Sequence, residues 1–151
     1  MRVKATRNSS LIREVLSDQR LHDAASEDGT TPLSEFEPNV DDIIWLALID
    51  DNDTVRGFMV VEEVSKVQVR VHIAIRSEFW GDKDNVQLGK LAFERIWELG
   101  AKKIIATIPT TDKQVLRYAQ RVGMKREGIN RQSFLRKGEL LDQYYLGLVA
   151  D

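Results

Sequence analysis

Two stretches of opposite charge contain most of the side chains that could bind a ligand electrostatically. Between Leu21 and Val55 there are ten Asp or Glu residues and no Lys or Arg. Between Lys113 and Lys137 there are eight Lys or Arg residues and a single acid, Glu127. One interpretation is a pair of solvated surfaces of opposite sign. The other is a basic side that binds an anion and an acidic side that faces a cationic partner.

Motifs for phosphate, calcium or ester chemistry are incomplete or absent in this sequence. The glycines of a phosphate loop would be Gly81 and Gly89, but seven residues separate them and Leu91 stands in the hydroxyl position. The segment that begins at Asp51 has the ends of a calcium loop but carries Val55 at a ligand position. The sequence contains no Gly-x-Ser-x-Gly, so a hydrolase nucleophile elbow is not indicated.

The two histidines, His22 and His72, are the remaining candidates for acid–base or metal chemistry. Neither has a partner at metal-ligand spacing and the chain has no cysteine, so no metal site is predicted. His72 falls in a predicted strand on the face opposite the valines, where most single histidines are structural or face solvent. The sequence therefore assigns neither histidine a catalytic role.

Length and composition indicate one globular domain. The chain has 151 residues, of which 42% are hydrophobic and 30% charged, and its net charge is −2. That is enough chain to bury a core without disulfides, and its acidic balance excludes a globally basic nucleic-acid binder. The apolar runs are far shorter than the roughly 18 residues of a membrane helix, and the first residues are not typical of a signal peptide. We expect a cytoplasmic protein with no membrane contact.

The elements that must position these residues are strands and amphipathic helices. Alternating and continuous apolar runs predict strands, with hairpin turns at Asp51–Thr54 and Lys137-Gly138. Apolar stripes predict a helix after Asn8, a helix over Val86–Leu99 and a helix that begins at Thr111. In chain order, the expected strands are Met1–Arg7, Ile43–Asp50, Val55–Glu63, Val67–Arg76, Lys102–Ile108, Met124–Arg136 and Leu140–Val149.

The order of these elements predicts the fold class. Strand, helix and strand from Val67 to Ile108 form a βαβ unit, so part of the sheet should be parallel. The other strands are joined by short links and should be antiparallel. We therefore predict an α/β (α+β) fold in a single domain, 1–151, with a mixed, mostly antiparallel sheet, a central βαβ unit and flanking helices. Residues 1–42 would hold a strand and helices, and 43–149 the sheet core.

Three segments make the sequence similar to a known family. They are Arg76–Gly81, the helix that follows it, and Val122–Gly128, which is similar to a Gly-Phe-x-x-Glu-Gly motif with Met124 in place of Phe. With the element order, these segments resemble the Gcn5-related N-acetyltransferases (GNAT), particularly the ribosomal-protein N-acetyltransferase branch. The resemblance covers residues 43–149, and residues 1–42 by element order only.

The resemblance implies transfer of an acetyl group from acetyl-CoA to an amine on a small molecule or a protein. In this fold two long strands, here Val67–Arg76 and Lys102–Ile108, splay apart, and the pantetheine arm of acetyl-CoA lies in the gap. The arm would pair with the backbone of Ile73, Ala74 and Ile75. The pyrophosphate would lie on the loop at the amino end of the next helix, which comprises Gly81, Asp82, Lys83, Asp84, Asn85 and Val86.

Several positions depart from the family pattern. The family loop Gln/Arg-x-x-Gly-x-Gly/Ala reads Trp80-Gly81-Asp82-Lys83-Asp84-Asn85, which brings two carboxylates to an anion site. Asp112 stands at a cofactor-binding Asn position, and Val115 stands at the catalytic Ser position. Tyr118 is the candidate acid for the departing thiolate, although it shares a helix side with valines, which favours packing. Glu78 is the candidate base.

Two function hypotheses follow. The first is an active N-acetyltransferase, in which the basic stretch suits the phosphates of acetyl-CoA and the acidic stretch suits a cationic amine. The second is a protein that kept the fold, lost the chemistry and acts through a protein partner in an assembly. The N-terminal third also resembles small acetyltransferase-like proteins of tailed phages, some of them head-assembly factors. A nucleic-acid module is not expected, because the aromatic residues do not alternate with the basic ones.

Overall fold

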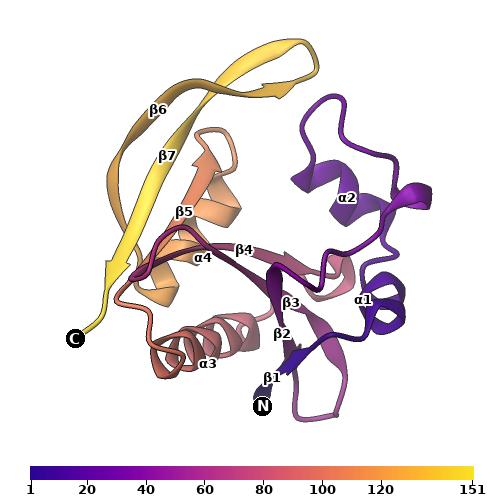
Figure 1. Ribbon diagram of the computed structural model, residues 1–151. Coiled ribbons are helices and arrows are strands. Elements are labelled where there is room, and N and C mark those ends of the chain that lie inside the picture. Colours follow the sequence, from indigo (N-terminus) through magenta and orange to yellow (C-terminus); the bar gives the residue numbers. More distant parts are fainter.

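The computed structural model describes residues 1–151 as a twisted sheet with helices on both faces (Figure 1). The strands are β1 (Arg2–Thr6), β2 (Ile43–Ile49), β3 (Val55–Glu63), β4 (Gln68–Ile75), β5 (Lys103–Pro109), β6 (Lys125–Arg136) and β7 (Glu139–Val149). The helices are α1 (Ser9–Val15), α2 (Gln19–Ala25), α3 (Asp84–Glu98) and α4 (Lys113–Val122), with short 3-10 helices η1 (Leu33–Glu35) and η2 (Ser77–Phe79). Each predicted strand is present, and its bounds differ from the prediction by at most one residue.

Side-chain caps start the two N-terminal helices. Asn8 accepts a hydrogen bond from the amide of Leu11 at 3.1 Å, and Asp18 accepts one from the amide of Leu21 at 3.2 Å. Such caps satisfy amides that the first helical turn leaves without a partner. None of the helices is both long enough and apolar enough to span a bilayer.

The sheet has seven strands in the order β1-β2-β3-β4-β5-β7-β6. All neighbours are antiparallel except β4 and β5, which are parallel and are joined through α3. This confirms the predicted fold class, a mostly antiparallel sheet with one βαβ unit. The parallel strands β4 and β5 share fewer residue pairs than any other two neighbouring strands of the sheet.

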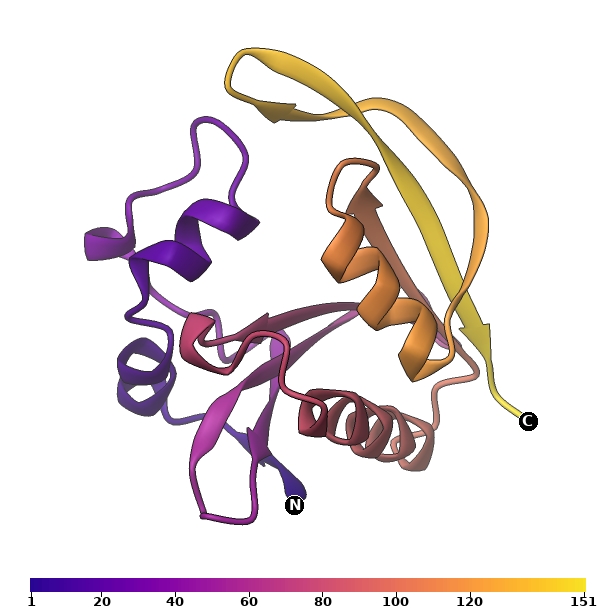
Figure 2. The ribbon, with the colours of Figure 1, turned by 180° about the vertical axis from the view of Figure 1, so that it is seen from behind.

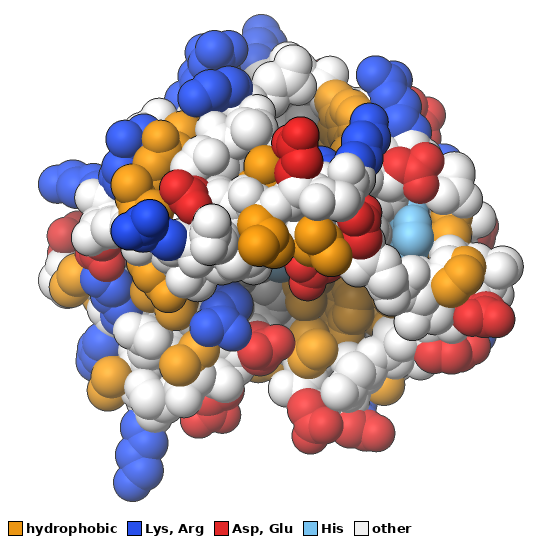
Figure 3. All heavy atoms as spheres, turned by 90° about the horizontal axis from the view of Figure 1, so that it is seen from above, with side chains coloured by type: hydrophobic (Ala, Val, Ile, Leu, Met, Phe, Trp, Pro, Cys, Tyr) orange, Lys and Arg blue, Asp and Glu red, His pale blue; other side chains and the backbone are white.

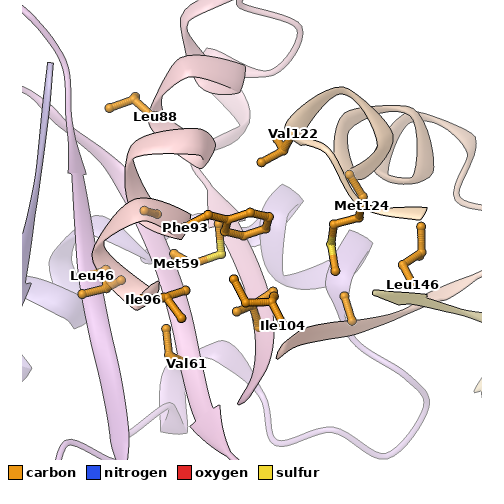
Figure 4. Packing of buried hydrophobic residues seen from close by; sticks show 14 of the residues in the cluster. Leu46, Met59, Val61, Leu88, Phe93, Ile96, Ile104, Val122, Met124 and Leu146 are labelled. Atoms are coloured by element: carbon orange, nitrogen blue, oxygen red, sulfur yellow. The ribbon is translucent and has the colours of Figure 1, made fainter. Parts of the chain in front are cut away.

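Two hydrophobic cores cover opposite faces of the sheet. On one face α3 and α4 pack against β2–β5 (Figure 2), and Leu88, Ile96, Ile104 and Leu146 are at most 1% exposed. Figure 4 shows Phe93 of α3 and Met59 of β3 within the same cluster. On the other face, α1 packs against alternate residues of β2 and β3. Full burial of each large aliphatic side chain contributes about 1.5–3 kcal/mol, so these cores hold the strands at fixed positions.

The parallel pair separates after three residue pairs. β4 and β5 pair only from Gln68↔Lys103 to Arg70↔Ile105, although both strands continue beyond that point. From there β4 continues beside β3 and β5 continues beside β7, so the two halves of the sheet diverge (Figure 1). We call this divergence of β4 and β5 beyond Arg70 and Ile105 the slot, and it is set by the pairing of the sheet and not by a loop.

The β6–β7 hairpin extends from the sheet and its tip contacts the segment after α2. Lys137 and Gly138 form the turn, both with positive φ, which glycine adopts at little cost. Asp28 accepts hydrogen bonds from both of these amides at 2.9 Å, and they hold the pKa of its carboxyl below the ordinary value. This contact joins the tip of the hairpin to the segment after α2.

Candidate functional site

The slot is bordered by the backbone of β4. The amide of Arg76 donates to the carbonyl of Arg56 in β3, and strand backbone groups alternate between the two sides. Ile73 and Ile75 therefore turn their backbone polar groups towards the slot, whereas Ala74 turns its groups towards β3. The indole of Trp80 donates to the Ile75 carbonyl at 2.8 Å. Ile73 is thus the predicted pantetheine contact whose backbone fits that role best.

The loop before α3 uses most of its amides internally. The amide of Asp82 donates to Phe79, that of Asn85 to the Asp82 carbonyl, and that of Val86 to Lys83. The amide of Asp84, the first residue of α3, donates to the side chain of Asp82 at 2.8 Å. This hydrogen bond lowers the pKa of Asp82. A carboxylate of the chain itself therefore occupies the amino end of α3, where the helix dipole favours an anion.

Arg56 of β3 lies behind this loop and holds it through ion pairs. Its guanidinium is 2.9 Å from Asp50 and 3.3 Å from Asp82, and it donates to the amide oxygen of Asn85 at 3.1 Å. The side chains of Arg56 and Asp50 are 8% and 5% exposed. The hydrogen bond from Arg56 lowers the pKa of Asp50. Burial works against the charge on Arg56, but its carboxylate partners raise its pKa. We call Arg56, Asp50, Asp82 and Asn85 the loop cluster.

Tyr118 of α4 packs against α3. Its hydroxyl donates to the backbone carbonyl of Asn85 at 2.8 Å, and burial raises its pKa above the ordinary value. The hydroxyl fits there because residue 89 is glycine: a Cβ at Gly89 would lie 2.3 Å from the phenolic oxygen. A raised pKa keeps the Tyr118 hydroxyl protonated, as a general acid must be. That proton, however, is donated to the Asn85 carbonyl of the protein.

Glu78 and Asp112 both have arginine partners. Glu78 lies in η2, is 59% exposed and accepts from Arg76 at 2.7 Å. Asp112 precedes α4 and pairs with Arg136 at 2.7 Å, and Arg136 also donates to the Ala24 carbonyl at 3.1 Å. Asp112 thus connects the start of α4 with the β6–β7 hairpin and the end of α2.

Asp18 fixes α2 beside the open end of β4. It caps α2 and also accepts hydrogen bonds from the amide and hydroxyl of Ser77, at 2.7 and 3.1 Å. Burial opposes its charge, but these hydrogen bonds hold the pKa of Asp18 below its ordinary value. The segment after α2 is consequently held over the face of β4 opposite to α3.

An open hollow of about 560 Å³ lies between α2, the segment that follows it, β4 and the β6–β7 hairpin. Its lining includes His22, Glu27, Glu35, Glu37 and His72, and it contains no Lys or Arg. In Figure 3, which views this region from above, Lys and Arg side chains gather mainly on the left and Asp and Glu mainly at the centre and right. The charge separation seen in the sequence therefore becomes a separation in space.

His72 contributes the one imidazole of the hollow that has no hydrogen-bond partner within the protein. His72 is exposed and lines the hollow, and desolvation by the neighbouring protein atoms lowers the pKa of its ring from the ordinary value. His22 differs, because its Nε2 lies 3.0 Å from the carbonyl of Thr31 and so holds the loop after α2. His72 therefore presents an imidazole without a protein partner to the hollow, two residues beyond the last β4–β5 pair.

The sequence reasoning located the loop and the slot but missed the loop cluster and the hollow. Gly81, Asp82 and Lys83 form the loop before α3, and Lys83 is exposed there. The prediction was wrong about Asp84, Asn85 and Val86, which form the first turn of α3, because the helix begins two residues before Val86. The side chain of Asn85 is buried against Arg56. One signal was available for the loop cluster: Arg56 is a charged residue inside an apolar strand, beside an acidic turn. For His72, the sequence indicated a position on the strand β4. It could not indicate that α2 and the segment after it pack over this strand and form the hollow.

Comparison with solved structures gives the fold a family context. Spermidine N-acetyltransferase from Vibrio cholerae, solved with CoA and spermine, matches at a TM-score of 0.81 and 14% identity over 97% of this chain and 94% of its own. A GNAT-family acetyltransferase from Bacillus anthracis matches at 0.76 and 16% identity over 99% and 95%. Ribosomal-protein-S5-alanine acetyltransferase from Vibrio fischeri matches at 0.78 and 13% over 99% and 92%. No family model and no curated protein matches the sequence. The chain therefore has the GNAT fold.

Proposed function

We propose that this protein transfers an acetyl group from a pantetheine thioester such as acetyl-CoA to a cationic amine. The observation that carries the proposal is the separation of β4 from β5 after Arg70 and Ile105, with the acidic hollow beginning at His72 next to it. A slot with strand backbone on its edge suits an extended amide-containing arm, because the arm can add hydrogen bonds where a strand would lie. The hollow suits the second substrate.

The reaction requires few chemical groups from the protein. The amine nitrogen attacks the thioester carbonyl carbon, a C–N bond forms, the C–S bond breaks and the thiolate leaves and takes up a proton. An amine that arrives as an ammonium ion must first lose a proton. Much of the acceleration can come from holding the two substrates together in the correct orientation.

We assign the proton-accepting role to His72. A base works best when its pKa lies near or below the working pH, so that it is neutral and can accept a proton. Desolvation lowers the pKa of His72, and its ring has no partner in the protein. Glu78 stays the base predicted from sequence, and its pairing with Arg76 makes it the weaker of the two. Tyr118 is the acid predicted from sequence, but its hydroxyl donates to the Asn85 carbonyl, so we assign it no proton transfer.

Charge in the hollow supports a cationic acceptor. Glu35 has no hydrogen-bond partner for its side chain, Glu27 uses one oxygen for the amide of Leu135, and Glu37 pairs with Arg13. With no Lys or Arg in the lining, the field there is negative, which raises the local concentration of cations. The similar fold from Vibrio cholerae was solved with spermine, a polycation. We infer an amine acceptor that carries a second positive charge.

The test is amine-dependent release of free thiol from acetyl-CoA and from acetyl-pantetheine. A diamine should be acetylated, and a monoamine that is neutral elsewhere should be a poorer substrate. Binding of the thioester should also raise the free energy of unfolding, by about 2.7 kcal/mol at 100 times its Kd. Absence of both thiol release and stabilisation with either thioester at millimolar concentration would overturn the proposal and leave only the fold.

A further inference from the structure

The amides at the start of α3 are already hydrogen-bonded within the protein, one of them to the carboxylate of Asp82. Of the six amides from Gly81 to Val86, those of Asp82, Asp84, Asn85 and Val86 donate to groups of the chain. Two amides, those of Gly81 and Lys83, have no partner in the protein. A pyrophosphate held by backbone amides needs several of them to converge on it. Here the carboxylate of Asp82 takes the place that a phosphate oxygen would take.

The charge of this region also opposes a pyrophosphate. Three carboxylates, those of Asp50, Asp82 and Asp84, surround the guanidinium of Arg56 within 4 Å. Lys83 adds one more positive charge on the exposed side of the loop. Three negative charges against two positive ones leave the loop negative, and a further anion would be repelled.

Arg56 is not free to serve an incoming phosphate. Its side chain is 8% exposed, its Nε donates to buried Asp50, and its guanidinium lies 4.8 Å from the ring centre of Phe79. The amide group of Asn85 is fixed as well, because it donates to the Phe79 carbonyl at 2.8 Å. If Arg56 turned towards a phosphate, the buried carboxylate of Asp50 would lose its cation. An unpaired charge in a buried, low-dielectric environment is strongly destabilising.

We propose that this chain recognises its acyl donor through the pantetheine arm and that the loop 81–86 does not bind the pyrophosphate. This inference rests on the proposed acetyl transfer and narrows its donor class. The donor is any acetyl thioester with a pantetheine arm, and acetyl-CoA has little advantage over acetyl-pantetheine. Recognition then depends on the slot beside Ile73, where the arm replaces a missing strand.

The experiment compares CoA with pantetheine, which has the same arm without phosphates, by titration calorimetry on the full chain. The two Kd values should agree within about threefold, since a loop with no net attraction adds little to the affinity. A CoA affinity a hundredfold higher than that of pantetheine would overturn the inference. It would show that the phosphates are bound, by this loop or by exposed α4 cations such as Lys113 and Arg117.

The variant Asp82→Asn tests the role of charge in the loop, because it removes a negative charge and keeps the shape of the side chain. In Asp82→Asn the side-chain oxygen can still accept from the amide of Asp84, so the start of α3 is retained while one negative charge is lost. CoA affinity should rise about tenfold because one repulsion is removed, and pantetheine affinity should not change. The matched control is Asp53→Asn in the β2–β3 turn, whose side chain pairs with Arg2 and not with Arg56 and which should alter neither Kd. A fall in CoA affinity of tenfold or more in Asp82→Asn, with pantetheine affinity unchanged, would overturn the inference, because it would show that this loop holds the pyrophosphate in the wild-type protein. If neither ligand binds wild-type protein, the proposed function itself fails.

Discussion

The loop cluster and the hollow both gather carboxylates but use them in opposite ways. In the loop cluster, Asp50 and Asp82 each accept hydrogen bonds from Arg56 or from backbone amides, and the group is largely buried. In the hollow, Glu35 and His72 have no partner within the protein and solvent reaches both. Polar groups that have partners therefore hold the fold together, whereas polar groups without partners are available to a ligand.

This difference is the reason why our proposal departs from the expectation drawn from sequence. The loop matched the family's phosphate-binding position, so it was expected to hold the cofactor, whereas the acidic stretch and the histidines had no motif. In three dimensions the loop is the internally satisfied region, and the hollow beside α2 is the region that still has unused hydrogen-bonding capacity. Five variants test this contrast between the loop cluster and the hollow.

Arg56→Met should have the largest effect, on stability. It leaves Asp50 buried without its cation, and breaking a buried pair in this way costs about 3–5 kcal/mol. Urea unfolding would measure it. The control is Arg70→Met, because Arg70 and Glu62 are about half exposed and such pairs contribute about 1 kcal/mol or less. Equal losses in the two variants would contradict a structural role for the loop cluster.

His72→Gln should lower kcat/KM for acetyl transfer about a hundredfold at neutral pH, the usual contribution of a positioned base. In wild type, His72 is neutral above its lowered pKa, so activity falls as pH falls through that value, below 6.5. This acid limb should vanish in His72→Gln.

His22→Gln is the control for the pH profile. His22 faces the same hollow, as do Glu27, Glu35 and Glu37, but its ring is engaged with Thr31. The acid limb should persist in this variant. If the acid limb of the pH profile is lost in His22→Gln but kept in His72→Gln, the base is His22 and not His72.

Tyr118→Phe should affect stability more than catalysis. It removes the hydrogen bond to the Asn85 carbonyl, which costs about 1 kcal/mol, and thiol release should stay within about twofold of wild type. Glu78→Gln, which breaks only the pair with Arg76, should change turnover equally little. A large loss of turnover in either variant, with folding intact, would restore that residue to the catalytic role predicted from sequence.

Glu35→Gln should have the smallest effect, on KM alone. Removing one exposed carboxylate from the hollow should raise the KM for a diamine about threefold and leave kcat unchanged. The KM for a monoamine acceptor should move less. Glu98→Gln on α3, which breaks an exposed pair with Arg95, is the control and should leave both values unchanged. A rise in KM for both kinds of acceptor would contradict recognition by charge.

Much of the fold could be predicted because its signals are local. Alternation in β4 and the apolar stripe of α3 each involve residues close in the chain, and the Lys137-Gly138 turn is set by two adjacent residues. The same is true of the strand–helix–strand order that makes β4 and β5 parallel. Such features depend on backbone geometry that short segments adopt wherever they lie.

The sequence by itself thus determined the elements, their order, the one parallel pair and the opposite charges of its two stretches. Only the tertiary structure decided which polar groups satisfy one another. Arg56 meets Asn85 across 29 positions of the chain, and Asp28 meets Gly138 across 110. His72 faces a hollow because α2 and the β6–β7 hairpin meet above it. The physical reason is that burial and hydrogen-bond partnership are fixed by neighbours in space, which the packing of whole elements brings together and no local pattern encodes.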